Sequence, residues 1–489
     1  MPAAVEHFWQ QLASHGGQPA LSGPEQQLSY LQLLEAVDQR CARLQEAGAR
    51  RVALALDNSL DWVLWDLALL RSGRVHVPLP GFFSSSQQQH VLDSAGIDTL
   101  LTPAGTAAPD GFRALRPGLW QRRPATVARL PAGTCKITYT SGTTGQPKGV
   151  CLSAGAQLAV AGSLRQACAS SQIRHHLCAL PLAVLLENLA GIYAQLLAGA
   201  RIELRPLEQL GMSGAAGFQA SRFLEVLHQC RPHSLILLPQ LLLALVSAVE
   251  QGQPLPDSLR FIAVGGGRVA PRLLERAAAL GLPVFEGYGL SECASVVCLN
   301  TPEARRPGSV GRPLAHVRLQ IAGDGEVLVQ GSPLLGYLGE PDHRAPWLAS
   351  GDLGYLEDGF LFLHGRKKNQ FITAFGRNVN PEWVEAELVQ QAPIAQAWLH
   401  GEAQAKNVAV LVPRNPATPL AAIGAAVSRV NQELPDYARV HHWLLAEHPF
   451  TASNGLATTN GRLRRPALFQ HYSAAIAAVL QAPERKSMP

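Results

Sequence analysis

The chain has few charged and few aromatic residues for its length. Of its 489 residues, 16% are charged and 6% are aromatic, and the net charge is only +5. Because no long block of lysine and arginine is present, nucleic acid is not an expected partner. A hydrophobic content of 47% excludes a disordered protein and indicates well-packed globular domains. The small basic excess is compatible with anionic substrates such as nucleotides.

C-x-x-C spacing is missing, although the chain contains eight cysteines. A disulfide framework or a zinc site is therefore not expected, and reduced thiols in a cytoplasmic protein are the prediction. The first residues, Met1–His7, contain no basic region followed by an apolar one. This pattern predicts no signal peptide.

Uninterrupted apolar runs are also too short to cross a membrane. Glu187 interrupts the apolar stretch Val184–Ala200, and Pro239 interrupts Leu235–Val249. A transmembrane helix needs about 20 consecutive apolar residues. We therefore expect no transmembrane segment, and both stretches are predicted to form buried helices and strands.

Short apolar runs alternate with longer helical patterns through the first three quarters of the chain. This alternation predicts an α/β fold with largely parallel sheets. Helices are expected at Ser59–Arg71 and at Pro271–Leu280, whose proline suits a first helical turn. The expected strands are Arg51–Leu56, Arg74–Leu79, Ser234–Leu238, Phe261–Val264 and Val284–Phe285.

The pattern changes near Val317–Val329, where Gly323–Gly325 signals a hairpin between short strands. After Arg366 the chain is typical of a compact α+β unit of roughly 120 residues. Since 489 residues exceed what one core usually fills, we expect two domains, residues 1–366 and 367–489.

Residues Ile137–Val150 combine glycines, hydroxyls and one lysine directly after a β-type run. Glycines let backbone N–H groups turn toward an anion, and Lys148 adds a positive charge, so the loop suits a polyphosphate. It is not a Walker A loop, because Pro147 precedes the lysine and Gly149 follows it. The candidate phosphate ligands beside Lys148 are Thr140, Ser141, Gly142, Thr143, Thr144 and Gly145.

This stretch resembles the phosphate-binding motif of the acyl-adenylate-forming (AMP-binding) superfamily, which includes acyl-CoA synthetases, peptide-synthetase adenylation domains and luciferases. The resemblance implies ATP and Mg²⁺ as cofactors, with Thr144 and Glu292 at the metal. It also implies the fold: a large N-terminal domain of stacked, mostly parallel sheets with helices and a distorted β-barrel region. A small, mobile α+β domain is expected to follow it.

Two further segments resemble the acyl-binding side of the same superfamily. Leu180–Asn188 is similar to the L-P-L-A-H-x-x-E segment of fatty-acyl-CoA synthetases, with Glu187 retained and Val184 in place of the histidine. Ala263–Arg268 contains the glycines Gly265, Gly266 and Gly267 after a predicted strand. In the family this loop lines the adenine and acyl pockets.

The remaining motifs resemble the nucleotide site. Gly287–Glu292 matches Y-G-x-[ST]-E, which implies that Tyr288 stacks on adenine, Ser291 touches the α-phosphate and Glu292 helps to hold Mg²⁺. The other residues implied are Gly289 in the same motif, Asp352 and Arg366 at the ribose, Lys368 as the hinge of the small domain, and Gly376 beside the channel for the thiol arm.

One position departs from the pattern. Phe450–Arg465 resembles the ending of fatty-acyl-CoA synthetases, but Arg462 stands where the family has a lysine that bridges the carboxylate and the α-phosphate. A planar guanidinium does not replace a compact ammonium without rearrangement. Either Arg462 makes the bridge at some loss of rate, or adenylation is impaired and the chain uses preformed acyl-AMP. We favour the first.

The resemblance implies an AMP-forming acid–thiol ligase. Lys148, Glu292 and Arg462 would act on a carboxylic acid and ATP, and CoA would then take the acyl group. No aspartate that could bind the α-ammonium group of an amino acid lies near Leu180–Asn188, so amino-acid substrates are disfavoured. A medium- or long-chain acid, or another hydrophobic acid, is the favoured substrate. Aryl acids remain possible substrates. Two alternatives remain: a ligase that loads a carrier-protein phosphopantetheine, and a nucleotide-binding homologue with impaired adenylation.

Overall fold

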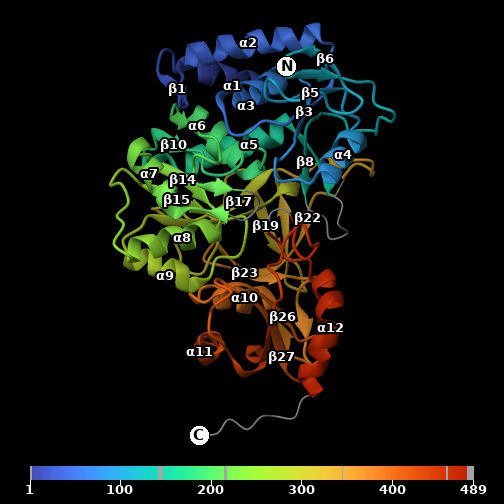
Figure 1. Cartoon of the computed structure of the whole chain (residues 1–489). Coiled ribbons are helices and arrows are strands. Elements are labelled where there is room, and N and C mark those ends of the chain that lie inside the picture. Colours follow the sequence, from blue (N-terminus) through green and yellow to red (C-terminus); the bar gives the residue numbers. More distant parts are fainter. Residues whose placement is uncertain (1–2, 141–146, 214–216, 344, 459–460, 482–489) are drawn as a thin grey trace.

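The fold is α/β with a larger N-terminal part and a smaller C-terminal part, seen in Figure 1 as the upper and lower regions of the chain. The computed structural model describes residues 3–140, 147–213, 217–343, 345–458 and 461–481. Among these residues no helix is long and apolar enough to span a bilayer.

A nine-stranded sheet forms one half of the N-terminal part, and its central strands are parallel. Its strand order is β18 (Arg312–Pro313), β17 (Ser295–Leu299), β16 (Val284–Leu290), β15 (Phe261–Val264), β14 (Ser234–Leu237), β10 (His175–Leu177), β11 (Arg201–Glu203), β1 (Pro19–Ser22) and β2 (Gln27–Ser29). A short hairpin, β12 (Met212–Ser213) with β13 (Gly217–Phe218), lies outside it.

An eight-stranded sheet forms the other half, and its four strands β8, β4, β3 and β5 are parallel. Its order is β21 (Gly336–Tyr337), β9 (Lys148–Ser153), β8 (Thr134–Thr140), β4 (Val75–Pro78), β3 (Arg51–Leu54), β5 (Thr99–Leu101), β7 (Leu119–Gln121) and β6 (Arg113–Arg116). The predicted strands at residues 51, 74, 234, 261 and 284 are therefore present.

Helices cover both sheets. Apolar residues of the first helices share one core with strands of both sheets, whereas α7–α9 pack on the nine-stranded sheet and α4 on the eight-stranded one. The helices are α1 (Ala3–Ser14), α2 (Tyr30–Glu46), α3 (Leu60–Arg71), α4 (Ser85–Ser94), α5 (Ala154–Ala167), the 3-10 turn η1 (Ala169–Ser171), the π-helix η2 (Glu187–Tyr193), α6 (Ala194–Leu197), α7 (Ala220–Cys230), α8 (Pro239–Glu250), α9 (Pro271–Ala279) and the 3-10 turn η3 (Ser291–Cys293).

Local sequence explains where the predicted helices begin. Ser59 caps α3 by accepting a hydrogen bond from the N–H of Trp62. Pro271 occupies the first turn of α9, where the missing N–H costs nothing. Both helices therefore begin within one residue of the predicted positions.

The region of the predicted hairpin is a four-stranded antiparallel sheet. Its strands are β19 (Arg318–Ile321), β20 (Glu326–Gln330), β22 (Leu348–Glu357) and β23 (Phe360–Arg366). β19 and β20 pair across the turn that contains Gly325, whose φ of +85° suits glycine. The pairing of β22 with β23 sets Asp352 opposite Arg366, so this sheet brings two predicted site residues together.

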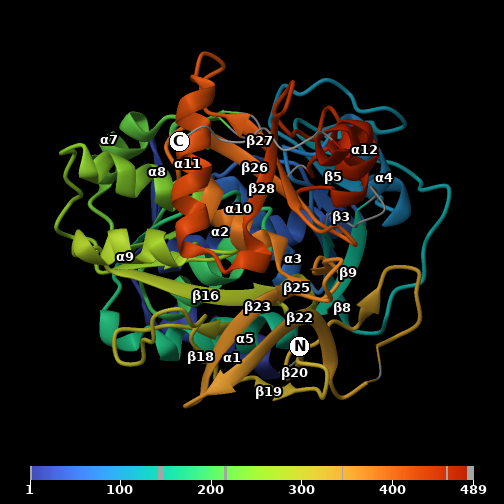
Figure 2. The same cartoon turned by 90° about the horizontal axis from the view of Figure 1, so that it is seen from below.

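The C-terminal part has its own apolar cores. It contains a hairpin, β24 (Phe371–Ile372) with β25 (Asn378–Val379), and a sheet of β26 (Ile394–His400), β27 (Asn407–Pro413) and β28 (Val440–Leu445), with α10 (Pro381–Val389), α11 (Leu420–Glu433), the 3-10 turn η4 (Asp436–Ala438) and α12 (Arg465–Gln481). Figure 2, seen from below, shows α10 and α11 in front of the N-terminal part above β16 and β23, and α12 in front of the region of α4 and β5.

Candidate active site

A large open cleft is lined by both parts of the chain. Its volume is about 2810 Å³, and its lining includes Gly266, Tyr288, Asp352, Arg366 and Arg462. Single ligand pockets usually measure roughly 300–1,000 Å³. The cleft is therefore large enough to hold several ligand groups at once, and it collects most of the predicted site residues that the structure describes.

Asp352 is held between a hydroxyl and a cation. The hydroxyl of Tyr288 donates to Oδ2 of Asp352 at 2.6 Å, and Nε of Arg366 lies 2.8 Å from Oδ1. Burial raises the pKa of Asp352, and the charge of Arg366 and the hydrogen bond from Tyr288 oppose that shift. The three residues form a preorganised acceptor for hydroxyl groups; the contact between Tyr288 and Asp352 was not predicted.

The glycine loop after β15 is shaped by close contacts with its neighbours. Gly266 has a φ of +76°, and a Cβ there would lie 2.9 Å from Cδ2 of Leu238. A Cβ at Gly265 would lie 3.1 Å from the carbonyl oxygen of Gly287. Gly289 has a different reason to be glycine, because a Cβ there would overlap the carbonyl of Ser295 on β17. The loop thus leaves backbone exposed to the cleft, whereas Gly289 is required by strand packing.

A second pair of contacts lies at the phosphate side. Nζ of Lys148 is 3.2 Å from Oε1 of Glu340 and 5.4 Å from the ring centroid of Tyr337. The hydroxyl of Tyr337 donates to Oε1 of Glu292 at 3.0 Å. Tyr337 therefore connects the predicted phosphate lysine with the predicted magnesium ligand. Neither Tyr337 nor Glu340 was predicted, since no motif marks them.

Part of the predicted phosphate loop lies outside the described residues, namely Ser141, Gly142, Thr143, Thr144 and Gly145. Thr140 ends β8 and pairs with Lys148 on β9. Ser291 and Thr140 both line the cleft. The end of β8 therefore places the first flank of the loop at the cleft, whereas Lys148 on the second flank does not line it.

Arg462 is brought to the nucleotide side of the cleft by the C-terminal part. Desolvation and the charge of Arg366 lower its pKa, while the carboxylates of Glu382, Asp352 and Glu292 oppose the shift. The Arg462 N–H donates to Oγ1 of Thr458 at 3.0 Å. Arg462 lines the cleft together with Asp352 and Glu382.

The hinge candidate Lys368 lies beside the same charges. Desolvation lowers its pKa, as do Arg366 and Arg462, whereas Glu382 and Asp352 raise it. Gly376 behaves differently: it has a φ of +71°, and a Cβ there would meet nothing within 4 Å. Gly376 and Lys148 do not line the cleft, and Glu292 lines a second pocket that shares Arg366 and Lys368 with it.

Glu286 and Arg268 are titratable residues on the cleft wall that the sequence analysis did not assign. Burial raises the pKa of Glu286 to about 8, and the charge of Arg268 opposes the shift. Nη1 of Arg268 is 3.4 Å from the carbonyl oxygen of His364 on β23. Burial thus favours the neutral form of the Glu286 carboxyl, and the charge of Arg268 favours the ionised form.

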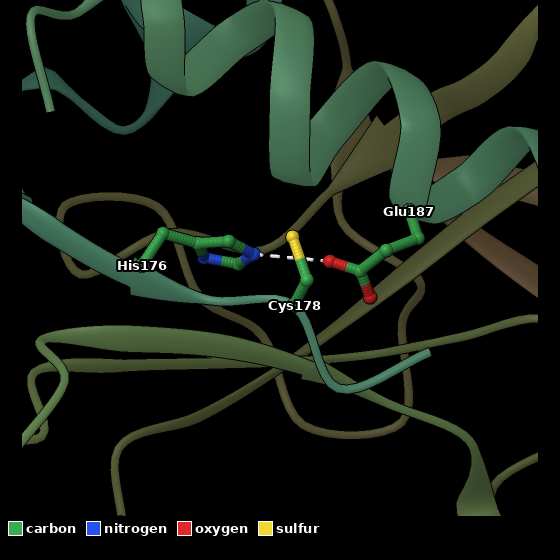
Figure 3. Close-up of side chains that lie close together, drawn as sticks. All are labelled: His176, Cys178 and Glu187. Carbon is green, nitrogen blue, oxygen red and sulfur yellow. Dashed lines mark hydrogen bonds and ion pairs between the residues drawn. The ribbon is translucent and has the colours of Figure 1, made fainter. Parts of the chain in front are cut away.

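Glu187, predicted from the acyl-side motif, does not line the cleft and lies in a buried cluster with Cys178 and with His176, which does line it (Figure 3). Nε2 of His176 is 3.1 Å from Oε1 of Glu187, whose Oε2 accepts the N–H of Leu180 at 3.0 Å. Oγ of Ser234 is 2.8 Å from Nδ1 of His176. The side-chain atoms of the three cluster members lie within 4.8 Å of one another, as metal ligands could.

The Glu187 carboxylate and both ring nitrogens of His176 already have hydrogen-bond partners. The cluster therefore fixes the position of the segment Leu180–Asn188. Val184 and Leu186 of that segment line the cleft. Glu187 also fills the space beside Gly191, where a Cβ would overlap its carboxylate. The acyl-side motif therefore contributes apolar side chains to the cleft, and its buried Glu187 holds the segment in place.

A second buried network, which the sequence analysis missed, lies behind strand β8. Nζ of Lys136 is 2.9 Å from Oδ1 of Asp66 and also donates to Asn188. Nδ1 of His76 is 2.7 Å from Oδ1 of Asp66. All four side chains are at most 2% exposed. The network ties α3, β4, β8 and η2 together directly behind the strand that leads into the phosphate loop.

Comparison with known proteins agrees with this fold. The model of the AMP-binding enzyme family matches residues 8–340, and that of the AMP-binding enzyme C-terminal domain matches residues 368–484. The fold and the site define an adenylate-forming enzyme of two parts. The chain belongs to the AMP-binding enzyme family.

Curated relatives are CoA ligases. A 2-succinylbenzoate–CoA ligase of Bacillus cereus (strain AH820) is 28% identical over 412 residues, which are 78% of this chain and 82% of the relative. The corresponding ligase of Bacillus subtilis (strain 168) is 30% identical over 286 residues, which are 55% of this chain and 56% of the relative. The predicted enzyme class agrees with these names, whereas the predicted fatty-acyl substrate is not confirmed by them.

Solved structures share the fold over nearly the whole chain. An anthranilate CoA ligase in complex with anthranoyl-AMP has a TM-score of 0.79 at 19% identity, covering 97% of this chain and 98% of its own. The o-succinylbenzoate CoA synthetase of Bacillus subtilis, in complex with its acyl-adenylate intermediate, has a TM-score of 0.74 at 24% identity, covering 94% and 97%. At these sequence identities, the structural similarity supports the fold and nothing more specific.

Proposed function

We propose that this protein is an AMP-forming acid–thiol ligase that activates a hydrophobic carboxylic acid and transfers it to CoA. The observation that carries the proposal is that Arg462 of the C-terminal part faces the cleft in which Asp352, Tyr288 and Arg366 form one polar cluster. The names of the relatives, all CoA ligases among those described above, support the same reaction class.

The first half-reaction would join the acid to ATP. The carboxylate oxygen attacks the α-phosphorus, the bond to the β-phosphate oxygen breaks, and pyrophosphate leaves. Lys148 would balance charge on the leaving group, and Arg462 would hold the carboxylate against the α-phosphate. Asp352 would accept hydrogen bonds from the ribose hydroxyls, which requires the Tyr288 hydroxyl to share or release Oδ2.

Glu292 fits a magnesium ligand because it presents a carboxylate beside the phosphate lysine, and Mg²⁺ binds proteins through one or two carboxylates plus phosphate oxygens. Magnesium would supply charge neutralisation for the triphosphate. Tyr337 would orient the Glu292 carboxylate by its hydrogen bond. The ion pair between Lys148 and Glu340 would have to break when Lys148 binds a phosphate. Both side chains are about half exposed, so this ion pair is weak.

In the second half-reaction a thiol would attack the carbonyl carbon of acyl-AMP and AMP would leave. Since Gly376 lies outside the cleft in this arrangement, the C-terminal part would have to rotate near Lys368 to bring it in. The division into residues 1–366 and 367–489 is part of this proposal. CoA is the acceptor proposed; a carrier-protein phosphopantetheine carries the same thiol arm.

The test is acid-dependent acyl hydroxamate formation with ATP, Mg²⁺ and hydroxylamine over a panel of aryl and aliphatic acids. We expect Lys148→Ala and Asp352→Ala each to lower the rate about 100-fold or more. The first removes the cation that would balance charge on the leaving pyrophosphate, and the second removes the carboxylate that would bind the ribose hydroxyls. Asp324→Ala serves as the control, since Asp324 is an exposed partner of Lys367 away from the cleft.

Near-normal rates in both site variants would contradict the proposal. A folded wild-type protein that binds ATP but forms no hydroxamate with any acid would support the nucleotide-binding alternative. Comparing CoA with a phosphopantetheinylated carrier protein as acceptor then decides between the two ligases.

A further inference from the structure

The positive net charge of the chain comes from one short segment. The chain has 41 basic and 36 acidic residues, and residues 113–129 contain five arginines with no lysine and no acidic residue. Outside these residues the two signs therefore balance. We call residues 113–129 the basic segment. It begins with β6, which is the last strand of the eight-stranded sheet and has all four of its residues exposed.

The backbone of the basic segment is fixed on the N-terminal part. Trp120 is buried, and its Nε1 donates to Oγ1 of Thr102 at 2.9 Å. Nη2 of Arg51 on β3 donates to the carbonyl oxygen of Ala128 at 2.7 Å. Because this backbone is already ordered, binding a partner requires only the ordering of its exposed side chains.

Three of the five arginines have no acidic partner among the residues that the structure describes, and all three are exposed: Arg113, Arg123 and Arg129. Arg116 lies 3.0 Å from Glu46. Arg122 lies 2.9 Å from Asp93. The pair at Arg116 is exposed on both sides and is therefore weak. The segment thus presents uncompensated positive charge to its surroundings.

Apolar side chains and the position of the segment narrow the kind of partner. Val127 is 61% exposed and Leu115 is 36% exposed. In Figure 1, β6 lies at the end of the molecule away from the C-terminal part, so a flat surface bound there leaves that part free. The segment also adjoins the cleft, because Thr102, which lines it, donates its N–H to the carbonyl oxygen of Gly118 at 3.0 Å.

We propose that the basic segment binds the surface of an anionic phospholipid bilayer. Arginine binds phosphate groups through two parallel hydrogen bonds, and Leu115 and Val127 would enter the interface between headgroups and acyl chains. An acidic protein matches the arginines, whereas a bilayer matches both the charge and the scattered apolar side chains. Bilayer binding goes beyond the proposed ligase function and does not depend on it.

The experiment measures co-sedimentation of the full chain with phosphatidylcholine vesicles and with vesicles that also contain about one third phosphatidylglycerol. Each basic residue near an anionic surface contributes about fivefold in binding, so three unpaired arginines predict about 100-fold tighter binding to the anionic vesicles. Raising the salt to about 0.5 M should remove most of this preference, because the charges are then screened.

The site variant combines Arg113→Gln, Arg123→Gln and Arg129→Gln and should lose the preference for anionic vesicles about 100-fold. The control variant combines Arg222→Gln, Arg260→Gln and Arg318→Gln, which removes the same charge from exposed positions outside the basic segment and the cleft. It should bind within about threefold of wild type. Both variants replace exposed side chains and should keep the melting temperature of wild type.

Val127→Ser, which keeps every charge, should weaken binding to anionic vesicles about threefold if the valine enters the interface. Wild-type binding that is equal for neutral and anionic vesicles would overturn the inference, as would an equal loss in the two triple variants. Binding to polyglutamate without binding to vesicles would also overturn it and would indicate an acidic protein as the partner. None of these measurements uses turnover, so each outcome leaves the proposed ligase function to its own test.

Discussion

At the scale of single residues, Arg462 is the side chain on which the proposed adenylation depends most. The sequence identified it as a departure from a lysine, and the structure places it at the cleft beside the charges of Arg366, Asp352 and Glu292. A guanidinium cannot give up its proton under ordinary conditions, so it retains its charge here despite desolvation. What changes from lysine to arginine is shape.

We expect Arg462→Ala to slow acid-dependent pyrophosphate release about 100-fold, because the carboxylate and α-phosphate lose their shared cation. Transfer of the acyl group from supplied acyl-AMP to CoA should change only a few-fold, since it needs no such bridge. Arg462→Lys, which restores a compact ammonium, should stay within about tenfold of wild type. Measuring the two half-reactions separately checks this, and an equal loss in both with Arg462→Ala would refute the assigned role.

Residues that belong to motifs could be predicted as site residues from the sequence, whereas residues that only contacts bring near them could not. Asp352, Arg366 and Tyr288 belong to short recognisable segments. Tyr337 and Glu340 stand in no such segment and reach the site because β21 pairs with β9, which carries Lys148. A contact between positions nearly 200 residues apart leaves no local pattern in one sequence.

At the scale of secondary-structure elements, the buried network behind β8 joins four of them. Burial alone would raise the pKa of Asp66, but the charge of Lys136 and hydrogen bonds from His76 and Asn188 outweigh it and lower the pKa. The unfolded carboxyl therefore binds a proton at higher pH than the folded one. Stability from this group is complete above the unfolded pKa and is lost as pH falls below it.

Lys136→Met should destabilise the protein by about 3–5 kcal/mol, because it leaves the Asp66 carboxylate buried without its cation. Lys148→Met is the control: Lys148 is half exposed and pairs with an exposed glutamate, so its loss should cost less than about 1 kcal/mol. Urea unfolding monitored by tryptophan fluorescence measures both. Equal midpoints for the two variants would show that the buried pair contributes no more than a surface one.

Most elements of the N-terminal part could be predicted, because their signals are local. Ser59 and Pro271 mark helix starts, and apolar runs mark the parallel strands. The Lys136 network could not, since its members lie far apart in the chain and a lysine in a strand is ordinarily exposed. The only feature of the sequence that indicates the network is Lys136, a lysine within the apolar run before the predicted phosphate loop.

At the scale of the whole molecule, the position of the C-terminal part decides which residues face the cleft. Polar contacts cross between the parts: Nη1 of Arg272 on α9 is 3.3 Å from Oε1 of Glu433 on α11, and Nη1 of Arg276 is 3.4 Å from Oε1 of Gln390. These contacts belong to the arrangement in which Arg462 reaches the nucleotide side.

Arg272→Glu should weaken this arrangement by placing two like charges together, and it should slow adenylation about two- to five-fold, in line with an exposed ion pair. The acyl-transfer half-reaction should not slow. Adding Glu433→Arg reverses the pair and should restore the rate. Rapid-mixing measurements of both half-reactions check this; a double variant as slow as the single one would mean that the pair does not hold the two parts together.

The sequence by itself determined the reaction class, the α/β alternation and the residues of the nucleotide motifs, because these depend on short segments whose chemistry is local. Tertiary structure decided which of those residues meet. It joined Tyr288 to Asp352 and placed Glu187 in a buried cluster with His176. The physical reason is that contact, burial and open space arise only when distant elements pack, and one sequence records none of them directly.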